Sequence, residues 1–324
     1  MLLTPQQARA LYEHAAQHRY AVLAVNADSP AAVVDCLMAA QVCDAPIIIE
    51  TSLWQLTAHS FGAGDPMLGI DLYLAQLRAL AASERFRDVP VVYHTDHIKG
   101  SATVHILTHA MRRKASSLSL DSSAMSAEEN IATMIRLGEI AMQEGLSLTL
   151  EMEAGVDDGI TPLEETRTLF GRVEQRMPGH LALWAPGVGT KHGLGNALDG
   201  FSPAAIRAHQ ELASELAGRP IGIALHGSSG LNVNQLQDGV AAGVVKVNWS
   251  SESLLIRSAA AAAYFDGNRE RLEPKHPDFK ISAMDDGLQR SISSVYVPKV
   301  KARIEALGGG GRASDFRQNL DSLS

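Results

Sequence analysis

Val91-Val92-Tyr93-His94-Thr95-Asp96-His97 begins as an apolar run and ends in two side chains that can bind a metal ion or move protons. Valine and tyrosine favour strands, so the run predicts a buried strand over residues 89–94. Asp96 and His97 follow that strand directly. The stretch therefore predicts reactive groups at the carboxyl end of a strand.

Seven similar apolar runs occur along the chain, and each is followed by a helical pattern. This alternation predicts βα units and a parallel sheet. Eight such units in roughly 250 residues match a (β/α)8 TIM barrel better than a doubly wound sheet. The other predicted strands cover residues 21–26, 45–50, 117–121, 147–151, 181–185, 221–226 and 244–248.

The barrel is expected to occupy residues 1–267, and local signals support its helices. Ser126 and Glu129 have the spacing of a capping box, and Ser202-Pro203 has the residue types that begin a helix. Residues 268–324 predict a C-terminal helical extension, either part of the same domain or an oligomer arm. Its helix is expected near 288–307, followed by a glycine linker (308–311) and a free polar tail.

A TIM barrel gathers its active site at the carboxyl ends of its strands. Polar residues stand at or just beyond those ends in this sequence: Asn26, Ser52, Asp96, His97, Asp121, Glu153, His226 and Asn248, with His192 in the loop after the sixth strand. Glu151 and Glu153 are two residues apart and should share one face of the fifth strand, pointing into the barrel mouth. Glu151 could instead pair with a core lysine such as Lys246.

Three of the 12 histidines, His97, His192 and His226, fall at such strand ends. Three neutral imidazoles are a common ligand set for a catalytic Zn²⁺ or similar ion that keeps a position open for substrate. The alternative is three unrelated polar residues in loops. Glycines beside His192 and His226 favour a site, because they let backbone amides approach a bound anion such as phosphate.

Composition excludes several classes of partner. The net charge is −8, from 36 acidic and 28 basic residues, so nucleic acid and anionic membrane are not expected partners. No apolar stretch has the length of a membrane span, and no signal peptide is recognisable, which predicts a cytoplasmic protein. Cys36 and Cys43 lack metal-site spacing and are expected to be structural thiols.

Six motifs in order resemble the class II, metal-dependent ketose-bisphosphate aldolases, which include the fructose-bisphosphate and tagatose-bisphosphate aldolases. The resemblance spans residues 26–252. Its motifs are His94-Thr95-Asp96-His97, Leu120-Asp121-Ser122-Ser123 with Glu128-Glu129-Asn130-Ile131, Glu151-Met152-Glu153, Lys191-His192-Gly193, His226-Gly227-Ser228-Ser229-Gly230 and Lys246-Val247-Asn248.

The resemblance implies a zinc-dependent aldolase, or one using Co²⁺ or Mn²⁺, that cleaves a ketose phosphate or related ketose into a dihydroxyacetone phosphate-like donor and an aldehyde. Asp96 would act on the hydroxyl beside the cleaved bond, and Asp157 or Asp158 would protonate the donor. A homodimer or homotetramer is expected. The implied metal ligands are His97, His192 and His226, with Glu153 and Asp121 as further candidates, and the implied substrate contacts are Asn26, Ser52, Gly193, Gly227, Ser229, Asn248, Ser250 and Ser251.

The sequence also departs from the family pattern. One aspartate of the family's Asn-x-Asp-Thr-Asp motif is replaced by Ser250, and bulky Trp249 stands beside it. The family has an arginine that binds the far phosphate, but the corresponding segment of this chain has no arginine and contains Lys280. A lysine ammonium can supply the positive charge but not the two parallel hydrogen bonds of a guanidinium. These departures indicate a substrate other than a standard sugar bisphosphate.

Two alternatives belong to other classes of protein. A non-catalytic, regulatory aldolase-like subunit would keep the barrel without the chemistry, although it would have no need of an assembled metal site. A TIM-barrel metallohydrolase is disfavoured because the first strand ends Ala24-Val25-Asn26, without the His-x-His pair typical of such enzymes.

Overall fold

The computed structural model describes the whole chain except residues 122–124, 156, 158, 196–199 and 324. Eight parallel strands pair in sequence order, and the eighth pairs with the first to close the barrel. The predicted (β/α)8 barrel is therefore confirmed. The strands are β1 (Val22–Asn26), β2 (Ile47–Thr51), β3 (Val91–Ile98), β4 (Ser117–Leu120), β5 (Leu150–Glu153), β6 (Leu181–Ala185), β7 (Gly222–Leu225) and β8 (Val244–Trp249).

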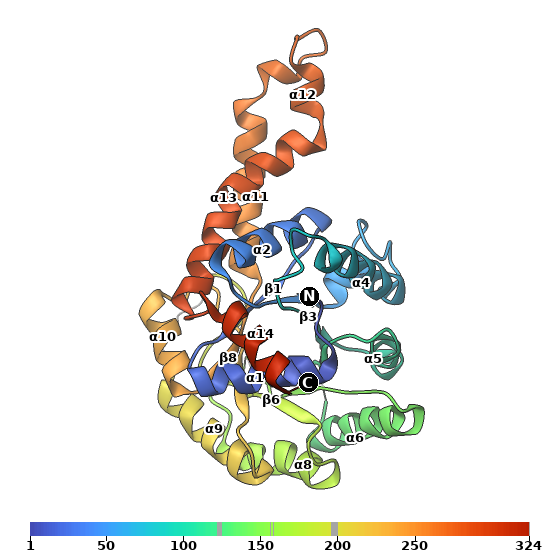
Figure 1. The fold of residues 1–324 in the computed structure, drawn as a ribbon, viewed down its shortest axis with the longest axis vertical. Helices are drawn as coiled ribbons and strands as arrows, with labels where there is room; N and C mark the ends of the chain where they lie inside the picture. Colours follow the sequence, from blue (N-terminus) through green and yellow to red (C-terminus); the bar gives the residue numbers. More distant parts are fainter. Residues whose placement is uncertain (122–124, 156, 158, 196–199, 324) are drawn as a thin grey trace.

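Helices surround the barrel, and two of them cross its amino-terminal end (Figure 1). The capping box at Ser126 and the Ser202-Pro203 helix start are both confirmed. The helical segments are α1 (Pro5–His18), α2 (Pro30–Cys43), α3 (Leu53–Thr57), α4 (Pro66–Ala82), α5 (Thr103–Arg112), α6 (Ala127–Glu144), α7 (Leu163–Glu165), η2 (Thr166–Gly171), α8 (Arg172–Arg176), α9 (Pro203–Ala217), α10 (Val233–Ala242), α11 (Ser251–Gly267), η3 (Glu270–Leu272), α12 (Phe279–Ala283), α13 (Asp285–Ala306) and α14 (Arg312–Leu323).

The strands separate two apolar cores, as the alternation of side chains along a strand requires. Leu23 and Val25 of β1 face the outer helices, whereas Val22 and Ala24 face the barrel interior. The interior core continues into α1, which closes the amino-terminal end of the barrel. The carboxyl ends of the strands are left open for the site.

The predicted free polar tail after residue 311 is wrong. The segment forms α14, whose Phe316 is fully buried against α1 and the barrel interior. The glycines do not act as a linker, because the amide of Gly311 donates to the carbonyl of Cys43 and fixes the start of the helix. The free energy gained by burying the Phe316 side chain exceeds the conformational entropy lost when the flexible glycines are fixed.

Helices α11 and α13 project from the barrel as an arm that carries α12 at its far end (Figure 1). Lys280 lies in α12, so it stands far from the mouth of its own barrel. Within the described part of the chain, no helix has the length and apolar character needed to cross a bilayer. Cys36 and Cys43 are both free thiols, as expected.

Candidate active site

The three histidines singled out in the sequence meet at the open end of the barrel. The ring centre of His97 lies 4.9 Å from that of His192 and 4.8 Å from that of His226. Their nitrogen atoms lie within 4.8 Å of one another, which is the spacing of a potential metal site. Residues 129 positions apart in the sequence are thus brought to one point by the barrel.

A β-bulge places His97 in this cluster. The prediction ended β3 at residue 94, but the strand continues to Ile98, with a register shift between Thr95 and Ile98. His97 adopts a left-handed backbone conformation with φ of 51°, which is uncommon outside glycine and costs energy. Bulges re-aim side chains beside active sites, and this one is associated with the turn of the His97 ring toward the other histidines.

Each of the three imidazoles is held by one carboxylate on one of its nitrogens. The pairs are His226 Nε2 with Glu151 at 2.7 Å, His97 Nδ1 with Glu153 at 3.2 Å, and His192 Nδ1 with Asp157 at 3.0 Å. A neutral imidazole donates through one nitrogen and keeps a lone pair on the other. Carboxylates that fix the ring in this way are typical outer partners of metal-binding histidines.

The facing nitrogens of two of the rings share one positive charge. His226 Nδ1 and His97 Nε2 lie 3.1 Å apart, at hydrogen-bond distance, so either a proton or a metal ion can sit between the cluster's nitrogens. Burial, followed by the charge of His97, lowers the pKa of His226 well below its usual value. Burial also acts to lower the pKa of His97, but Asp96 and Glu153 outweigh it and raise that pKa. The residues therefore fit a positive ion with nitrogen ligands.

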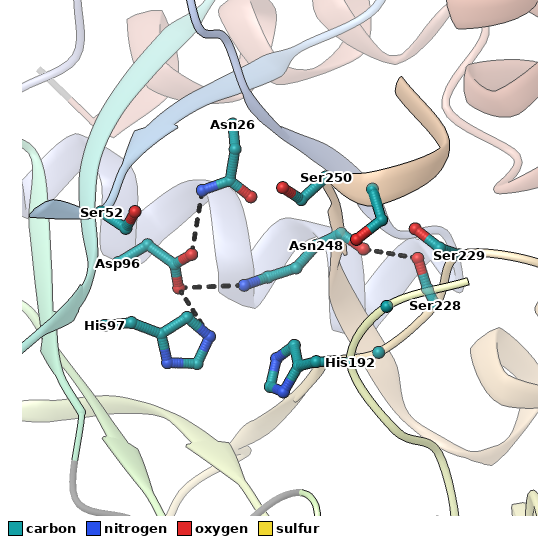
Figure 2. A pocket seen from close by; sticks show the side chains of 12 residues that line it. Asn26, Ser52, Asp96, His97, His192, Ser228, Ser229, Asn248 and Ser250 are labelled. Carbon is teal, nitrogen blue, oxygen red and sulfur yellow. Dashed lines mark hydrogen bonds and ion pairs between the residues drawn. The ribbon is translucent and has the colours of Figure 1, made fainter. Parts of the chain in front are cut away.

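Asp96 lies beside the cluster, 3.7 Å from His97 Nε2 (Figure 2). Asn26 donates from Nδ2 to one of its carboxylate oxygens at 3.0 Å, and Asn248 donates to the other at 3.1 Å. Burial acts to raise the pKa of Asp96, but the charges of His97 and Lys246 outweigh it and lower that pKa. Asp96 is consequently an ionised, oriented carboxylate at the edge of the cluster.

A fully buried ionic network lies below the histidines inside the barrel. Lys246 Nζ is 3.1 Å from Glu50 and 3.0 Å from Glu151, and it donates to Asn248 Oδ1 at 2.6 Å. Glu151 thus pairs with the lysine, as one interpretation expected, and also accepts from His226. Burial, then the charge of Asp96, raises the pKa of Glu50 to about 8. The network supports the site from beneath.

Sequence reasoning missed Glu50 as part of this network. The signal was available, because Glu50 directly follows Ile47-Ile48-Ile49 in the same way that Lys246 interrupts a run of valines. Charges in apolar runs are costly unless they are paired. Opposite charges within two predicted barrel strands therefore indicate an internal ion pair.

Replacing Lys246 by methionine is expected to lower the free energy of unfolding by about 3–5 kcal/mol, because it leaves two buried carboxylates without their shared cation. Urea denaturation measures the effect. Lys301→Met is a matched control, since Lys301 is half-buried on α13 and its ion pair among the described residues is with Glu305 one turn away. Its expected effect is within about 0.5 kcal/mol. Equal urea midpoints for the two variants would contradict the prediction.

A cavity of about 200 Å³ adjoins the histidines. All eight predicted substrate-contacting residues line it, together with Ser228, which was not singled out. Gly227 has φ of 64°, and a Cβ there would stand 2.8 Å from the carbonyl oxygen of Lys191. The position therefore requires glycine. The lining residues are Asn26, Ser52, Asp96, His97, His192, Gly193, Gly227, Ser228, Ser229, Asn248, Ser250 and Ser251.

A second cavity, of about 430 Å³, shares Ser52, His97 and His192 with the first. Trp54, 83% exposed, and Lys99 contribute to its walls. Asp121 pairs with Lys99 at 3.1 Å and lies outside the metal-like clusters of the described residues, so its role as a ligand stays a prediction. Asp158 and the motif residues Ser122 and Ser123 lie outside the described residues.

Comparison with known proteins decides the family. The model of the class II fructose-bisphosphate aldolases matches residues 6–310. The chain belongs to this family. It is 26% identical to the fructose-bisphosphate aldolase of Saccharomyces cerevisiae, covering 90% of this chain and 88% of that one. It is 27% identical to the enzyme of Streptococcus pyogenes serotype M1, covering 92% and 96%.

Solved structures show the same fold. Fructose-bisphosphate aldolase from Campylobacter jejuni superposes with a TM-score of 0.80 at 21% identity, covering 95% of each chain. The YdjI aldolase from Escherichia coli K12 gives 0.71 at 18% identity, covering 97% of this chain and 100% of that one. As a divergent member of the class II family, the protein is an aldolase, a lyase that breaks and forms carbon–carbon bonds.

Proposed function

We propose that this aldolase acts on a ketose phosphate, with Zn²⁺ or another divalent ion held by His97, His192 and His226 and with Asp96 as acid/base. The observation that carries the proposal is the three-histidine cluster, in which one nitrogen of each ring is paired with a carboxylate and ring nitrogens of all three residues lie within 4.8 Å of one another. Glu153 is a further ligand for a second metal position. Co²⁺ and Mn²⁺ suit the same donor set.

When bound, the ion supplies Lewis-acid stabilisation of the negative charge that the broken bond leaves on the donor. The residues of the chain perform the other tasks. Asp96 removes the proton from the hydroxyl group whose carbon becomes the aldehyde. The electron pair of the carbon–carbon bond then passes to the donor, which becomes an enediolate and must later gain a proton. Asn26 and Asn248 keep the Asp96 carboxylate aimed at the substrate.

Asp157 was one candidate for the group that returns this proton. In the structure its carboxylate accepts hydrogen bonds from the backbone and the ring of His192, at 2.8 Å and 3.0 Å. Burial acts to raise the pKa of Asp157, but these hydrogen bonds outweigh it and lower that pKa. A low-pKa carboxylate is a poor proton donor at neutral pH, so we propose that Asp157 chiefly orients His192.

The 200 Å³ cavity suits the phosphate of the donor. Its walls are glycine backbone and serine hydroxyls, and the 17-residue helix α11 begins there with Ser250 as an N-cap that makes no side-chain capping bond. Backbone amides at a helix start favour anions. Ser250 in place of an aspartate removes a negative charge from this wall. The 430 Å³ cavity, with Lys99 and Trp54, suits the aldehyde half.

The other two hypotheses have no support in the structure. A regulatory subunit does not require the carboxylate partners of the three histidines, which a scaffold would carry at a cost in buried charge. A metallohydrolase likewise has no use for a base held by two amides beside a phosphate-sized cavity. The homodimer or homotetramer stays a prediction from the resemblance.

The donor half-reaction tests the proposal directly. We expect the metal-replete protein to exchange a carbinol proton of dihydroxyacetone phosphate for deuterium in D₂O, and a chelator to abolish the exchange. Proton NMR follows the loss of the signal. Dihydroxyacetone without phosphate is the matched control and should exchange far more slowly. Absence of exchange with metal-replete protein would overturn the phosphorylated donor.

A further inference from the structure

A buried arginine of the C-terminal arm contacts the wall of the proposed donor cavity. Arg303 lies on α13 and is 8% exposed. Its Nη2 donates to the carbonyl oxygen of Ser228 at 2.7 Å and to the Ser228 hydroxyl at 2.9 Å. Nη1 donates to the carbonyl of Leu231 at 3.4 Å. A single guanidinium thus clamps the loop that follows β7, which contributes Gly227, Ser228 and Ser229 to the cavity.

The same guanidinium reaches the second wall of the cavity through Glu252. Arg303 Nη1 donates to Glu252 Oε2 at 3.3 Å, and Trp249 Nε1 donates to that oxygen at 2.8 Å. The guanidinium carbon also lies 5.5 Å from the centre of the Trp249 ring, where a cation is attracted to the aromatic face. Glu252 is in the first turn of α11, and its amide donates to Ser229 Oγ at 3.2 Å. Both walls are therefore joined through one side chain.

Through this arrangement the positive charge of Arg303 can act on a bound anion without touching it, by polarising the peptide group between them. Among the described residues lining the cavity there is no lysine or arginine. The Ser228 carbonyl belongs to the same peptide group as the Ser229 N–H, and in a trans peptide the N–H points away from the carbonyl that Arg303 contacts. A charged donor on the carbonyl polarises that peptide and strengthens its N–H as a donor. Lysine could supply the charge but not the fork that holds several acceptors together.

We propose that Arg303 is a positioning residue that organises and polarises the phosphate subsite from outside the cavity. The inference rests on the proposed phosphorylated donor. It gives the C-terminal arm a role in substrate binding in addition to any role in assembly. The Ser228 hydroxyl extends the connection, because it donates to the carbonyl of Asn248, whose side chain holds Asp96.

The test compares Arg303→Met and Arg303→Lys with Arg290→Met. Arg290 is an exposed arginine of the same helix, and its ion pair among the described residues is with Asp286. Isothermal titration of the Co²⁺-loaded proteins with inorganic phosphate measures the subsite, and the Co²⁺ absorption spectrum monitors the histidine cluster. We expect Arg303→Met to weaken phosphate binding by about 10- to 100-fold, with an unchanged Co²⁺ spectrum. Arg303→Lys should fall between it and wild type, and Arg290→Met should equal wild type.

Steady-state kinetics adds a second readout, in which Arg303→Met raises the KM for the donor more than it lowers kcat. If Arg303→Met fails to fold, Arg303→Lys decides, since it keeps the charge and loses the fork. Phosphate binding equal to wild type in a folded Arg303 variant would overturn the inference alone. Wild-type protein that binds Co²⁺ but no phosphate would overturn the phosphorylated donor, and the inference with it.

Discussion

Asp96→Asn is expected to lower kcat for aldol cleavage by about 10²- to 10⁴-fold. The amide has nearly the shape of the carboxylate but cannot take up the hydroxyl proton as the bond breaks. Its effect on KM is expected to be smaller, because the phosphate contacts are formed by other residues. A coupled assay of aldehyde formation, with the substrate at saturation, measures the loss.

The donor half-reaction separates this role from general damage to the site. Proton exchange on dihydroxyacetone phosphate involves a different carbon from the hydroxyl that Asp96 serves, so exchange should persist in Asp96→Asn while cleavage is lost. Metal content should also be retained, because the three histidines form a potential ligand group of their own, separate from the group in which Asp96 joins His97, Glu153 and His226. Cleavage within tenfold of wild type would show that another group carries the proton.

The alternation of apolar runs and helical segments was sufficient to predict the barrel. The run at Leu181–Ala185 was located to the residue, since it lies between the strand-breaking pairs Gly179-His180 and Pro186-Gly187. The fifth strand was predicted to begin three residues and to end two residues too early, and it runs over Leu150–Glu153. Periodicity identifies a strand more reliably than it fixes the ends, because pairing with neighbours decides where a strand begins.

The C-terminal tail shows a signal that was present in the sequence and overlooked. Ala313, Phe316 and Leu320 are spaced three and four residues apart, the pattern of one helix face. The four glycines before them indicated a flexible linker instead. Tertiary packing decided the outcome, since Phe316 and Leu320 pack against the interior core that includes residues of α1, and Ala313 is buried as well.

The histidines of the site could be predicted, but their partners could not. Strand ends place His97 and His226 at the same edge of any TIM barrel. The β-bulge before Ile98, the choice of Glu151 for His226 and the path of Arg303 to Ser228 depend on distances that arise only in the folded chain. Residue type and spacing were therefore enough to predict which strand ends form the cluster. The hydrogen bonds and ion pairs among its residues could be identified only from the folded structure.

His226→Ala is expected to abolish both metal binding and aldol cleavage. Loss of an outer carboxylate from a metal site costs about 10–100-fold in affinity, so loss of the ligand itself should exceed that range. Inductively coupled plasma analysis of the purified protein measures the metal content, and isothermal titration with Zn²⁺ measures the affinity. The variant should still fold, because Lys246 remains 3.0 Å from Glu151 and keeps that buried carboxylate paired.

His105→Ala is the matched control for this variant. His105 and His109 have the helical spacing of a metal pair, but His105 is exposed on α5 and His109 pairs with Asp71. Metal content and cleavage should therefore equal those of wild type. Glu151→Gln gives an intermediate case, because the ring of His226 loses its charged partner yet remains a ligand. Chelator-sensitive cleavage retained by His226→Ala would show that the ion is bound elsewhere, and the three-histidine site would be wrong.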